Sequence, residues 1–497
     1  MEHFDVIIVG AGLSGIGAGY HLQTRSPGRR YLILEGREAI GGTWDLFRYP
    51  GIRSDSDMYT LGYRFKPWRD AKAIADGPAI REYVRETARE NGIDRHIRFR
   101  NLVRRASWSS AEARWTVEAE AGPDKLPVRF TCNFLFMCSG YYSYAEGHTP
   151  EFAGAGDFAG QIVHPQFWPE DLDYKNKRVV VIGSGATAVT LVPELAKEAA
   201  QVVMLQRSPT YVVARPAEDA LANWLKRRLP IRLAYWLTRW HNVLFGMYFY
   251  NLARKRPEAV KQRLIEMVRQ ELGESCDVQT HFTPRYNPWD QRLCLVPDAD
   301  LFAAIREGRA SVVTDQIERF TRKGILLKSG KEVEADIIVT ATGLKLTVLG
   351  GMELSVDGAP VNMAKVMAYK GMMYSGVPNL ASSFGYTNAS WTLKCDLTCE
   401  YICRLLNYMD RQGYASATPQ RDASVEEAPW LGLTSGYIAR ARDILPKQGM
   451  TRPWRLYQNY ALDLVTLRYG RVNDGTMVFS APPRLSAPAA EELAAAS

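Results

Sequence analysis

The chain has 497 residues, of which 46% are hydrophobic and 23% charged, a composition typical of a folded enzyme with two or three domains. Its formal net charge of +8 suits nucleic acid or an acidic membrane surface, but a site for a phosphorylated cofactor explains part of it equally well, and we expect no nucleic-acid partner. No window reaches roughly 18 uninterrupted apolar residues and the seven cysteines lack the paired spacing of a zinc site, which predicts a cytoplasmic protein with free thiols and no metal.

The amino-terminal segment predicts a strand, a glycine turn, a helix and a second strand. These elements occupy residues 4–9, 10–15, about 16–23 and 31–34. Gly10 permits the tight turn, Gly12 lets the backbone approach a pyrophosphate, and Gly15 lets the helix pack close to the strand. The helix N-terminus supplies free N–H groups for the phosphates. Because Glu35 lies 20 residues after Gly15, where a carboxylate can bond ribose hydroxyls, the segment predicts a site for FAD.

The same architecture recurs near the middle of the chain. A β-rich run, a Gly-Ser-Gly turn, a helix and a second strand occupy residues 178–182, 183–188, about 189–199 and 202–205. This second strand leads into Gln206, Arg207 and Ser208 rather than into an acid. A carboxylate there would repel a 2′-phosphate, whereas a guanidinium can bind it through two hydrogen bonds. We therefore predict a site for NADPH, and an arginine on a solvated loop is the alternative.

Between residues 217 and 290 the alternation of strands and helices lapses. The stretch 221–275 is rich in Trp, Tyr, Leu, Arg and Lys and has no strand signals, which predicts a helical insertion into the second nucleotide domain. Its mixture of aromatic and basic residues suits a membrane surface. We favour the alternative, a helix hairpin packed against its own domain.

The last third of the chain must return to the first domain and complete it. Residues 336–343 predict a strand that ends at a glycine turn. A long amphipathic helix over residues 391–410 follows, with Ser390 or Asn388 placed to cap it. We expect the last dozen residues, which are rich in Ala and Glu, to form a frayed tail.

The predicted fold is α/β, with two Rossmann-like dinucleotide-binding domains of the FAD/NAD(P)-binding fold. Residues 1–147 form the first part of the FAD-binding domain, and residues 344–497 form its returning part and the C-terminal segment. Residues 148–343 form the NADPH-binding domain, which contains the helical insertion at about 217–290.

Two nucleotide folds on one chain predict hydride transfer from NADPH to a flavin, and the next electron acceptor decides the class of enzyme. Disulfide reductases carry a cysteine pair soon after the first acid, but the matching segment 41–47 has Trp44 and no cysteine. Cys132 and Cys138 straddle a strand and are expected in the core. Three more cysteines follow helical spacing, which suits buried packing better than metal or redox work: Cys395, Cys399 and Cys403. Oxygen is the remaining acceptor.

The segment between the two glycine loops carries a family motif. Residues 158–169, Phe-Ala-Gly-Gln-Ile-Val-His-Pro-Gln-Phe-Trp-Pro, fit the pattern F-x-G-x-x-x-H-x-x-x-W-P. On this motif the chain resembles the type I (class B) Baeyer–Villiger monooxygenases. Flavin monooxygenases that oxidise nitrogen or sulfur are similar but typically carry Phe or Tyr in place of Trp168. The segments 42–57, 287–292 and 385–394 are most similar to a mycobacterial subgroup that activates thioamide prodrugs.

The resemblance implies a sequence of steps and an active-site ion pair. NADPH reduces FAD, dioxygen adds at flavin C4a, and the resulting peroxyflavin attacks the carbonyl of a small hydrophobic ketone to give an ester or lactone. Sulfur in thioethers or thioamides is also oxidised. Arg292 matches the active-site arginine of the family and Asp55 its acidic partner. The sequence alone does not select Arg292 over Arg48, Arg53 or Lys394, and a purely structural ion pair stays open.

The resemblance also assigns the remaining site residues. Arg207 and Ser208 hold the 2′-phosphate, and His164 sits in a linker motif, which indicates a hinge organiser rather than a catalytic acid or base. The hinge or fingerprint residues are Phe158, Gly160, His164, Trp168 and Pro169. The predicted cofactor-binding residues are Gly10, Gly12, Leu13, Ser14, Gly15, Glu35, Gly42, Thr43, Trp44, Asp45, Asp55, Tyr59, Gly183, Ser184, Gly185, Ala186, Thr187, Gln206, Arg207, Ser208, Thr342 and Gly343.

Two other functions stay open on the sequence. One is a flavin monooxygenase that oxygenates nitrogen or sulfur and has no Baeyer–Villiger activity. The other is a non-catalytic redox sensor that binds both nucleotides and docks peripherally on a membrane through the helical insertion. The sequence carries no signal for an oligomeric state.

Overall fold

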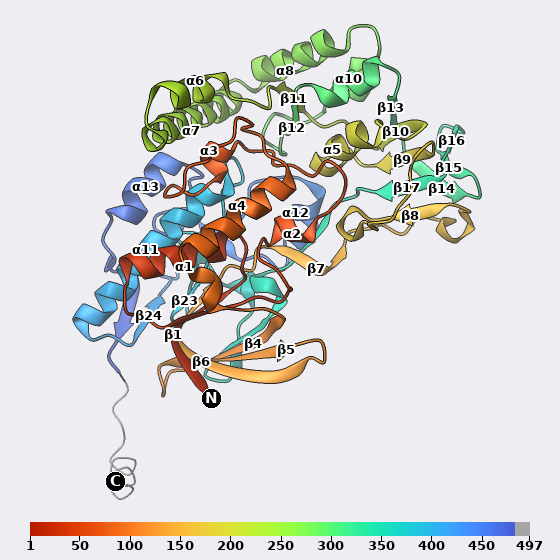
Figure 1. The fold of residues 1–497 in the computed structure, drawn as a ribbon. Helices are drawn as coiled ribbons and strands as arrows, with labels where there is room; N and C mark the ends of the chain where they lie inside the picture. The colour runs from red at the N-terminus through yellow and green to blue at the C-terminus, as the bar shows by residue number, and fades with distance from the viewer. Residues whose placement is uncertain (483–497) are drawn as a thin grey trace, which may run out of the picture.

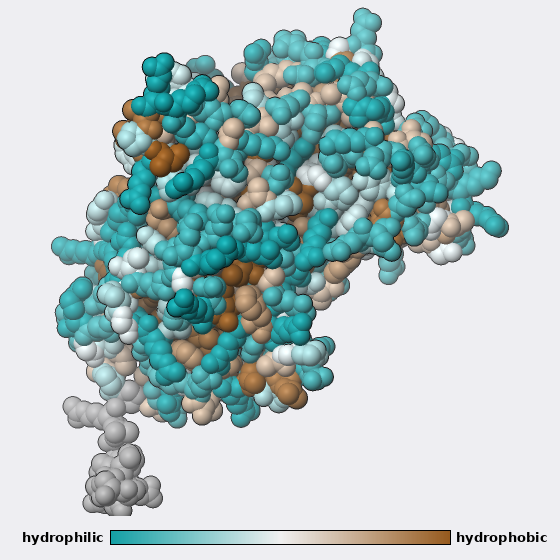
Figure 2. All heavy atoms as spheres, in the orientation of Figure 1, coloured by the Kyte–Doolittle hydropathy of each residue, from teal (hydrophilic) through white to brown (hydrophobic). Residues whose placement is uncertain are grey.

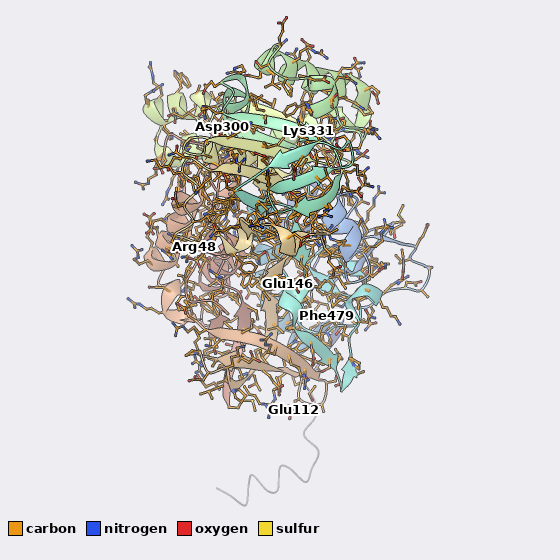
Figure 3. The ribbon with its side chains drawn as sticks, turned by 90° about the vertical axis from the view of Figure 1, so that its right-hand side faces the viewer. Arg48, Glu112, Glu146, Asp300, Lys331 and Phe479 are labelled. Carbon is orange, nitrogen blue, oxygen red and sulfur yellow. The ribbon has the colours of Figure 1, made fainter. Side chains whose placement is uncertain are left out.

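The computed structural model describes residues 1–482, and the Ala- and Glu-rich end that we expect to fray lies outside them. The chain forms two lobes, each built on one main sheet (Figure 1). The first lobe carries the sheet β20-β19-β4-β5-β6-β1-β2-β3, with β23 also beside β6, and the second carries β13-β10-β9-β17-β8. In the side view of Figure 3, Glu112 lies at the far end of the first lobe, Asp300 and Lys331 lie in the second, and Arg48 and Glu146 lie at the level between them.

The elements have the following bounds. The strands of the first sheet are β1 (Glu2–Val9), β2 (Tyr31–Leu34), β3 (Ile97–Arg98), β4 (Asn101–Ser109), β5 (Arg114–Ala121), β6 (Leu126–Met137), β19 (Glu353–Val356), β20 (Ala359–Pro360) and β23 (Leu380–Ser382). Those of the second are β8 (Gln161–Val163), β9 (Arg178–Ile182), β10 (Gln201–Gln206), β13 (Ala310–Thr314) and β17 (Ile337–Thr340). The main helices outside the insertion are α1 (Leu13–Arg25), α4 (Gly77–Glu90), α5 (Ala186–Leu195), α10 (Asp300–Arg306), α11 (Trp391–Gln412) and α13 (Tyr460–Arg468). Shorter elements are α2 (Thr43–Leu46), α3 (Met58–Leu61), α12 (Gly436–Ala441), β7 (Tyr142–Gly147), β11 (Val212–Arg215), β12 (Cys294–Pro297), β14 (Ile317–Thr321), β15 (Gly324–Leu327), β16 (Glu332–Glu334), β18 (Leu344–Leu346), β21 (Ala368–Tyr369), β22 (Met373–Tyr374), β24 (Ser416–Pro419), β25 (Glu427–Pro429), β26 (Lys447–Gly449) and β27 (Met477–Ser480).

The first glycine turn joins β1 to α1 under tight steric limits. β1 pairs in parallel with β2 and with β6, so its apolar residues are buried on both faces. Gly10 has a φ of +106°, and a Cβ there would lie 2.5 Å from the carbonyl oxygen of Cys138. A Cβ on Gly15 would overlap the carbonyl oxygen of Gly10, so α1 packs directly on the turn. The helix N-terminus therefore opens at the edge of the sheet, where a ligand can reach it.

The second unit repeats this arrangement. β9 pairs in parallel with β10 and with β17, and α5 follows the second glycine turn. Each unit is thus a strand, a glycine turn, a helix and a parallel strand, which confirms the predicted α/β fold with two Rossmann-like units. α5 ends at Leu195, a few residues earlier than the sequence pattern suggests.

The chain crosses between the lobes twice, and the two crossings lie side by side. β7 carries the chain out of the first lobe and β18 carries it back, and the two strands pair antiparallel, with Leu344 opposite Gly147. The domain boundaries that we propose, at residues 147 and 343, fall at this two-stranded connection. A paired connection of this kind restricts how the lobes can move relative to each other.

The helical insertion joins the two lobes instead of forming a hairpin on its own domain. It comprises α6 (Ala220–Arg228), α7 (Ile231–Lys255), α8 (Pro257–Leu272) and α9 (Val278–His281). α8 packs on α10 of the second lobe, whereas α7 packs on α3 of the first (Figure 1). On α7, Tyr235 donates a 2.9 Å hydrogen bond to the carbonyl of Tyr63. The helical content confirms the prediction, but packing against its own domain alone was wrong, because α7 buries an arginine against the first lobe.

That arginine is Arg239, which is only 3% exposed. Its Nη1 donates to the carbonyl oxygens of Tyr59 at 2.7 Å and Gly62 at 2.8 Å. Its Nη2 lies 3.8 Å from the carboxylate of Asp396 on α11. A buried guanidinium costs desolvation energy unless its donors are satisfied. These partners therefore fix the position of α7 on the first lobe.

The long helix α11 begins where the sequence predicts but is not capped as predicted. Ser390 occupies the N-cap position without a side-chain cap. Its hydroxyl instead forms a 2.6 Å hydrogen bond with Thr60, and the Asn388 amide donates to the carbonyl of Gln458. Residues from other segments therefore take the hydrogen bonds that these two side chains would otherwise form with the end of the helix. The cysteine stripe of this helix is buried, which confirms its assignment to the core.

Within residues 1–482, no helix combines the length and the apolar composition that crossing a membrane requires.

We predict that replacing Arg239 destabilises the protein strongly. The substitution Arg239→Met leaves two backbone carbonyls without their donor and removes the positive charge 3.8 Å from Asp396, so the free energy of unfolding should fall by about 3–5 kcal/mol. Urea unfolding of the holoprotein measures this. Arg232→Met, on the exposed face of the same helix, is the matched control and should change stability by less than about 0.5 kcal/mol. Equal effects of the two substitutions would contradict the bridging role of Arg239.

Candidate functional site

Both glycine loops open onto one cleft. The cleft has a volume of about 290 Å³ and lies between the two lobes. The first lobe contributes the glycine turn, the segment around α2 and the segment 52–56, and the second contributes the start of α5 and Arg292. The predicted site residues that line it are Gly12, Leu13, Ser14, Gly42, Thr43, Trp44, Asp55, Ala186, Thr187 and Arg292. The fold thus brings together residues that are up to 280 positions apart in the chain.

The floor of the cleft is bare backbone. A Cβ on Gly42, whose φ is +56°, would lie 3.0 Å from the Cα of Gly12, so the two glycines touch without side chains between them. Glu35 is 2% exposed, and its carboxylate accepts hydrogen bonds from the backbone N–H groups of Ala11 at 2.7 Å and Arg37 at 2.8 Å. Burial raises the pKa of Glu35. A bare floor at a helix N-terminus beside a buried acid fits the pyrophosphate and ribose of FAD.

Aromatic side chains form the walls. Trp391 donates a 2.9 Å hydrogen bond from Nε1 to the hydroxyl of Ser14, and its ring stacks on Tyr141 with centroids 5.1 Å apart. Trp44 and Tyr142 also line the cleft. These flat faces suit a planar ring system such as a flavin. The predicted site residues include neither Tyr141 nor Trp391, although Trp391 lies in the segment 385–394 that carries the resemblance, because the two rings meet only in the folded first lobe.

Arg292 and Asp55 face each other in the cleft, with Arg292 Nη1 3.5 Å from Asp55 Oδ2. Arg292 Nε also donates a 3.3 Å hydrogen bond to the carbonyl of Thr387. Burial alone would lower the pKa of Arg292, but the charge of Asp55 and the nearby tyrosine side chains outweigh burial and raise it. The guanidinium is therefore a fixed positive charge.

The other cations that the sequence left as alternatives have different partners. Arg48 pairs with Glu170 at 3.0 Å, and Arg53 pairs with Asp300. Lys394 pairs with Asp463 at 2.7 Å, outside the cleft. Among these four candidates, Arg292 is the one whose acidic partner also lines the cleft. The geometry therefore favours Arg292.

Some predicted cofactor residues lie behind the wall of the cleft. Tyr59 is fully buried and packs against Tyr235 of α7, so it supports the wall instead of lining it. Asp45 is 2% exposed, and its carboxylate pairs with Arg37 at 2.8 Å. Arginines hold the Asp45 carboxylate outside the set of residues that lines the cleft, and the prediction that Asp45 contacts the flavin with its neighbours Thr43 and Trp44 stays a prediction.

The second loop presents a free cation at the surface. Arg207 and Ser208 are exposed, and within residues 1–482 no carboxylate pairs with Arg207. Ser184 donates a 3.0 Å hydrogen bond to the carbonyl of Ser208, which ties this segment to the glycine turn containing Gly183 and Gly185. Gln206 differs, because its amide donates inward to the carbonyl of His281 at 2.7 Å. An unpaired arginine at this position suits a phosphate.

The fingerprint segment lies at the connection between the lobes. The His164 ring packs on Gly147, and its Nδ1 accepts a 3.1 Å hydrogen bond from the N–H of Gln166. Burial lowers the pKa of His164, which keeps the imidazole neutral. His164 does not line the cleft. The remaining fingerprint residues pack in the second lobe: Phe158 is buried, Gly160 lies against the carbonyl of Asp336, and Trp168, followed by Pro169, packs edge-on to Tyr174.

The last two predicted residues, Thr342 and Gly343, also lie at this connection. The Thr342 hydroxyl donates a 2.6 Å hydrogen bond to the carbonyl of His148, and the N–H of His148 donates to the carbonyl of Gly343. Gly343 has a φ of +113°. These bonds hold the outgoing and returning segments together at the end of β17.

Comparison with known proteins identifies relatives over the whole chain. The family described as flavin-binding monooxygenase-like matches residues 74–376, and the NAD(P)-binding Rossmann-like domain matches residues 8–75. The chain is 56% identical over 484 residues to the FAD-containing monooxygenase EthA of Mycobacterium tuberculosis, covering 97% of this chain and 99% of that protein. It is 49% identical over 481 residues to the probable FAD-binding monooxygenase AlmA of Acinetobacter baylyi, covering 96% of each.

Solved structures share the fold at lower identity. An oxidized steroid monooxygenase bound to NADP superposes with a TM-score of 0.77 at 24% identity, covering 96% of this chain and all of that chain. A cyclohexanone monooxygenase with bound epsilon-caprolactone superposes with a TM-score of 0.76 at 20% identity, covering 97% and 100%. Together with the cleft, these relatives confirm FAD and NADPH as the cofactors and confirm the resemblance on which the site was predicted.

We predict that the substitution Arg207→Gln weakens the binding of NADPH but not that of NADH. Loss of a charge-assisted contact to the 2′-phosphate should raise the KM for NADPH roughly 10- to 100-fold and leave the KM for NADH within about twofold. Stopped-flow bleaching of the flavin with each nucleotide measures this. Arg322→Gln, at another exposed position of the same lobe, is the control and should change neither value. An equal rise in the KM for NADPH and in the KM for NADH would contradict the proposal that Arg207 binds the 2′-phosphate.

Proposed function

The chain belongs to the flavin-binding monooxygenase-like family, and we propose that its reaction is a Baeyer–Villiger oxidation. The substrate is a small hydrophobic ketone, and the product is the ester or lactone with oxygen inserted next to the carbonyl. One atom of dioxygen enters the product, the other leaves as water, and NADPH supplies the two electrons. Sulfur in thioethers or thioamides is a second substrate class. The observation that carries this proposal is the Arg292–Asp55 pair in the cleft that both glycine loops share.

Arg292 stabilises negative charge that develops on oxygen during the reaction. Bound FAD supplies the activation of dioxygen once NADPH has reduced it. A cation held in place before the reaction stabilises the developing charge without reorganisation, which is most effective where water is excluded. Because the pKa of Arg292 is raised, the guanidinium does not give up a proton to the reacting oxygen. Asp55 and the carbonyl of Thr387 orient it.

The tyrosines beside Arg292 add polar hydroxyls to the cleft without adding charge. Burial raises the pKa of Tyr141 to about 12 and that of Tyr142 further, so both hydroxyls stay protonated near neutral pH. The two hydroxyls bond each other at 2.7 Å. No phenolate therefore competes with the reacting oxygen for Arg292.

We propose that His164 organises the hinge. The neutral imidazole packs against Gly147, next to the paired strands β7 and β18. Through this contact a movement of one lobe can shift the other, and no proton transfer is needed. Its burial outside the cleft supports this role over direct catalysis.

A second proposal is peripheral contact with an anionic membrane surface, in a protein that we expect in the cytoplasm. The exposed face of α6 and α7 gathers large aliphatic and aromatic side chains: Leu221, Trp224, Leu233, Trp236, Leu244, Phe245 and Tyr248. Figure 2 shows a brown patch over these two helices. Residues 220–257 hold eight Lys or Arg and no Asp or Glu. Apolar and aromatic side chains with flanking cations are the features of an interfacial helix.

We predict that Arg292→Ala separates oxygen insertion from flavin reduction. The variant should reduce its flavin with NADPH at a rate within about twofold of the parent, since Arg207 and the second loop are intact. Ester formation from 2-decanone should fall roughly 10²–10³-fold, because the fixed cation is gone. Gas chromatography with mass spectrometry measures the ester, and Arg48→Ala, whose guanidinium pairs with Glu170, is the control. Undiminished ester formation would remove the role of Arg292.

The unmodified protein distinguishes the reaction classes. A panel of linear ketones and thioethers with NADPH and oxygen should give esters and sulfoxides. Sulfoxides or N-oxides without any ester would favour the nitrogen- or sulfur-oxygenating alternative and overturn the proposal.

We predict that the protein floats with anionic vesicles. It should comigrate with phosphatidylglycerol vesicles in a density gradient and not with phosphatidylcholine vesicles, and Trp236→Ser with Phe245→Ser should abolish flotation. Leu126→Ser removes an apolar side chain that is 61% exposed in the first lobe and is the matched control. Flotation that persists in the double variant would rule out the α6–α7 face.

A further inference from the structure

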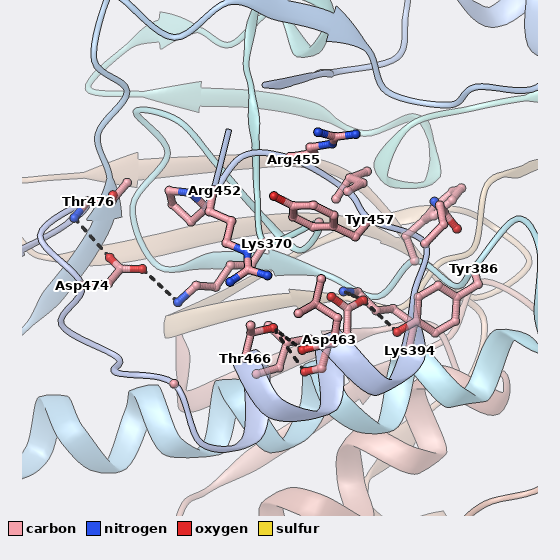
Figure 4. A pocket seen from close by; sticks show the side chains of 18 of the residues that line it. Lys370, Tyr386, Lys394, Arg452, Arg455, Tyr457, Asp463, Thr466, Asp474 and Thr476 are labelled. Atoms are coloured by element: carbon pink, nitrogen blue, oxygen red, sulfur yellow. Dashed lines mark hydrogen bonds and ion pairs between the residues drawn. The ribbon is translucent and has the colours of Figure 1, made fainter. Parts of the chain in front are cut away.

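A second chamber lies behind the aromatic wall of the cleft. It has a volume of about 410 Å³, is partly open to solvent, and is lined by α11, α13 and the segments 370–371 and 452–458 (Figure 4). Phe384 lines the chamber and Trp391 lines the cleft, and their ring centroids are 5.0 Å apart. A Cβ on Gly385 would lie 2.5 Å from the Trp391 ring. One layer of aromatic side chains therefore separates the chamber from the cleft.

Positive charge dominates the chamber. Five cations line it, Lys370, Lys394, Arg452, Arg455 and Arg471, against two carboxylates, Asp463 and Asp474. Both carboxylates are engaged by lysines, since Lys394 Nζ lies 2.7 Å from Asp463 and Lys370 Nζ lies 2.9 Å from Asp474. The three arginines form no ion pair within residues 1–482. Five cations less two carboxylates leave three positive charges, which an anionic ligand can balance.

Two of the arginines lie over one aromatic ring, and all three side chains are exposed at the mouth of the chamber. The guanidinium carbons of Arg452 and Arg455 lie 5.1 and 5.0 Å from the centroid of Tyr457. Figure 4 shows these three side chains on one wall of the chamber, across from Asp463 and Thr466. Placing two cations on one ring costs repulsion that an anion between them relieves. Planar guanidinium groups placed in this way match the two oxygens of a carboxylate.

The remaining lining is apolar. Phe384, Trp430, Leu456, Leu462 and Leu467 contribute it. Leu456 is next to Arg455 in the chain, whereas Phe384 and Trp430 lie against each other with centroids 4.5 Å apart, beside the wall of the cleft. The chamber thus has an arginine-rich end and an apolar end, and the apolar end faces the flavin cleft.

We propose that this chamber binds an aliphatic carboxylic acid, with its carboxylate at Arg452 and Arg455 and its chain directed toward Phe384 and Trp391. The volume lies within the range of sites for small organic ligands. Binding of the acid does not rest on the proposed Baeyer–Villiger reaction, because a layer of aromatic side chains separates the chamber from the cleft.

Calorimetric titration of the holoenzyme with decanoate and with 1-decanol tests the binding. Decanoate should bind one site at least about tenfold more tightly than the neutral alcohol, and this preference should shrink when salt is raised. The double substitution Arg452→Gln with Arg455→Gln should weaken the binding of decanoate at least about tenfold and leave the binding of 1-decanol unchanged. Arg471→Gln alone, on another segment, should weaken decanoate to a smaller degree. Arg263→Gln, an exposed arginine of α8, is the control.

The proposal is overturned if decanoate and 1-decanol bind equally, if decanoate does not saturate, or if the arginine variants bind decanoate as the parent does. Correct folding of each variant is checked by its flavin content and melting temperature. Arg455→Lys should retain part of the preference, because it keeps the charge and loses the planar fork.

Discussion

Ion pairs that cross between the lobes hold the cleft in its shape. Arg292 from the second lobe meets Asp55 from the first, and Arg53 from the first meets Asp300 from the second. Arg239 of the insertion reaches Asp396 at 3.8 Å and satisfies two backbone carbonyls of the first lobe. The Arg239–Asp396 pair is buried, so separating it leaves an uncompensated charge at a high cost, whereas the side chains of Arg292 and Asp55 are 38% and 40% exposed and their pair contributes less. The relative position of the lobes, and with it the distance between the two glycine loops, therefore depends on these contacts.

Local patterns in the sequence predicted the nucleotide units well, because each unit is determined by residues close together in the chain. A glycine turn such as the one at Gly10 needs a φ that other residues rarely adopt, and that requirement is visible in the sequence. The docking of α7 was not predictable in this way, since it depends on Arg239 meeting carbonyls about 180 residues away. Ser390 failed as a cap for a similar reason, because Thr60 offers its hydroxyl a partner from another segment.

The candidate site shows the same contrast between residues that local sequence patterns identify and residues that only contacts in space identify. The residues of the glycine loops could be named from spacing alone, but Arg292 could be selected among four cations only once each had been paired with its partner in space. Arg48, Arg53 and Lys394 are each engaged with a carboxylate outside the set that defines the cleft. Tyr59 and Asp45 are buried outside the lining of the cleft, since proximity in sequence to lining residues does not by itself make a side chain point into a cleft.

The two cavities use arginine for different purposes, and the difference lies in the partners. Arg292 has Asp55 beside it, so its charge is largely balanced before any ligand arrives, and the role we propose for it is to respond to charge that arises on oxygen during the reaction. Arg452 and Arg455 share the face of Tyr457 without an acid, so their charge is unbalanced until an anion arrives with its own. A paired arginine in a cleft suits catalysis, and unpaired arginines around a chamber suit binding. The aromatic contact between Phe384 and Trp391 keeps these two electrostatic environments apart while leaving them one ring's thickness from each other.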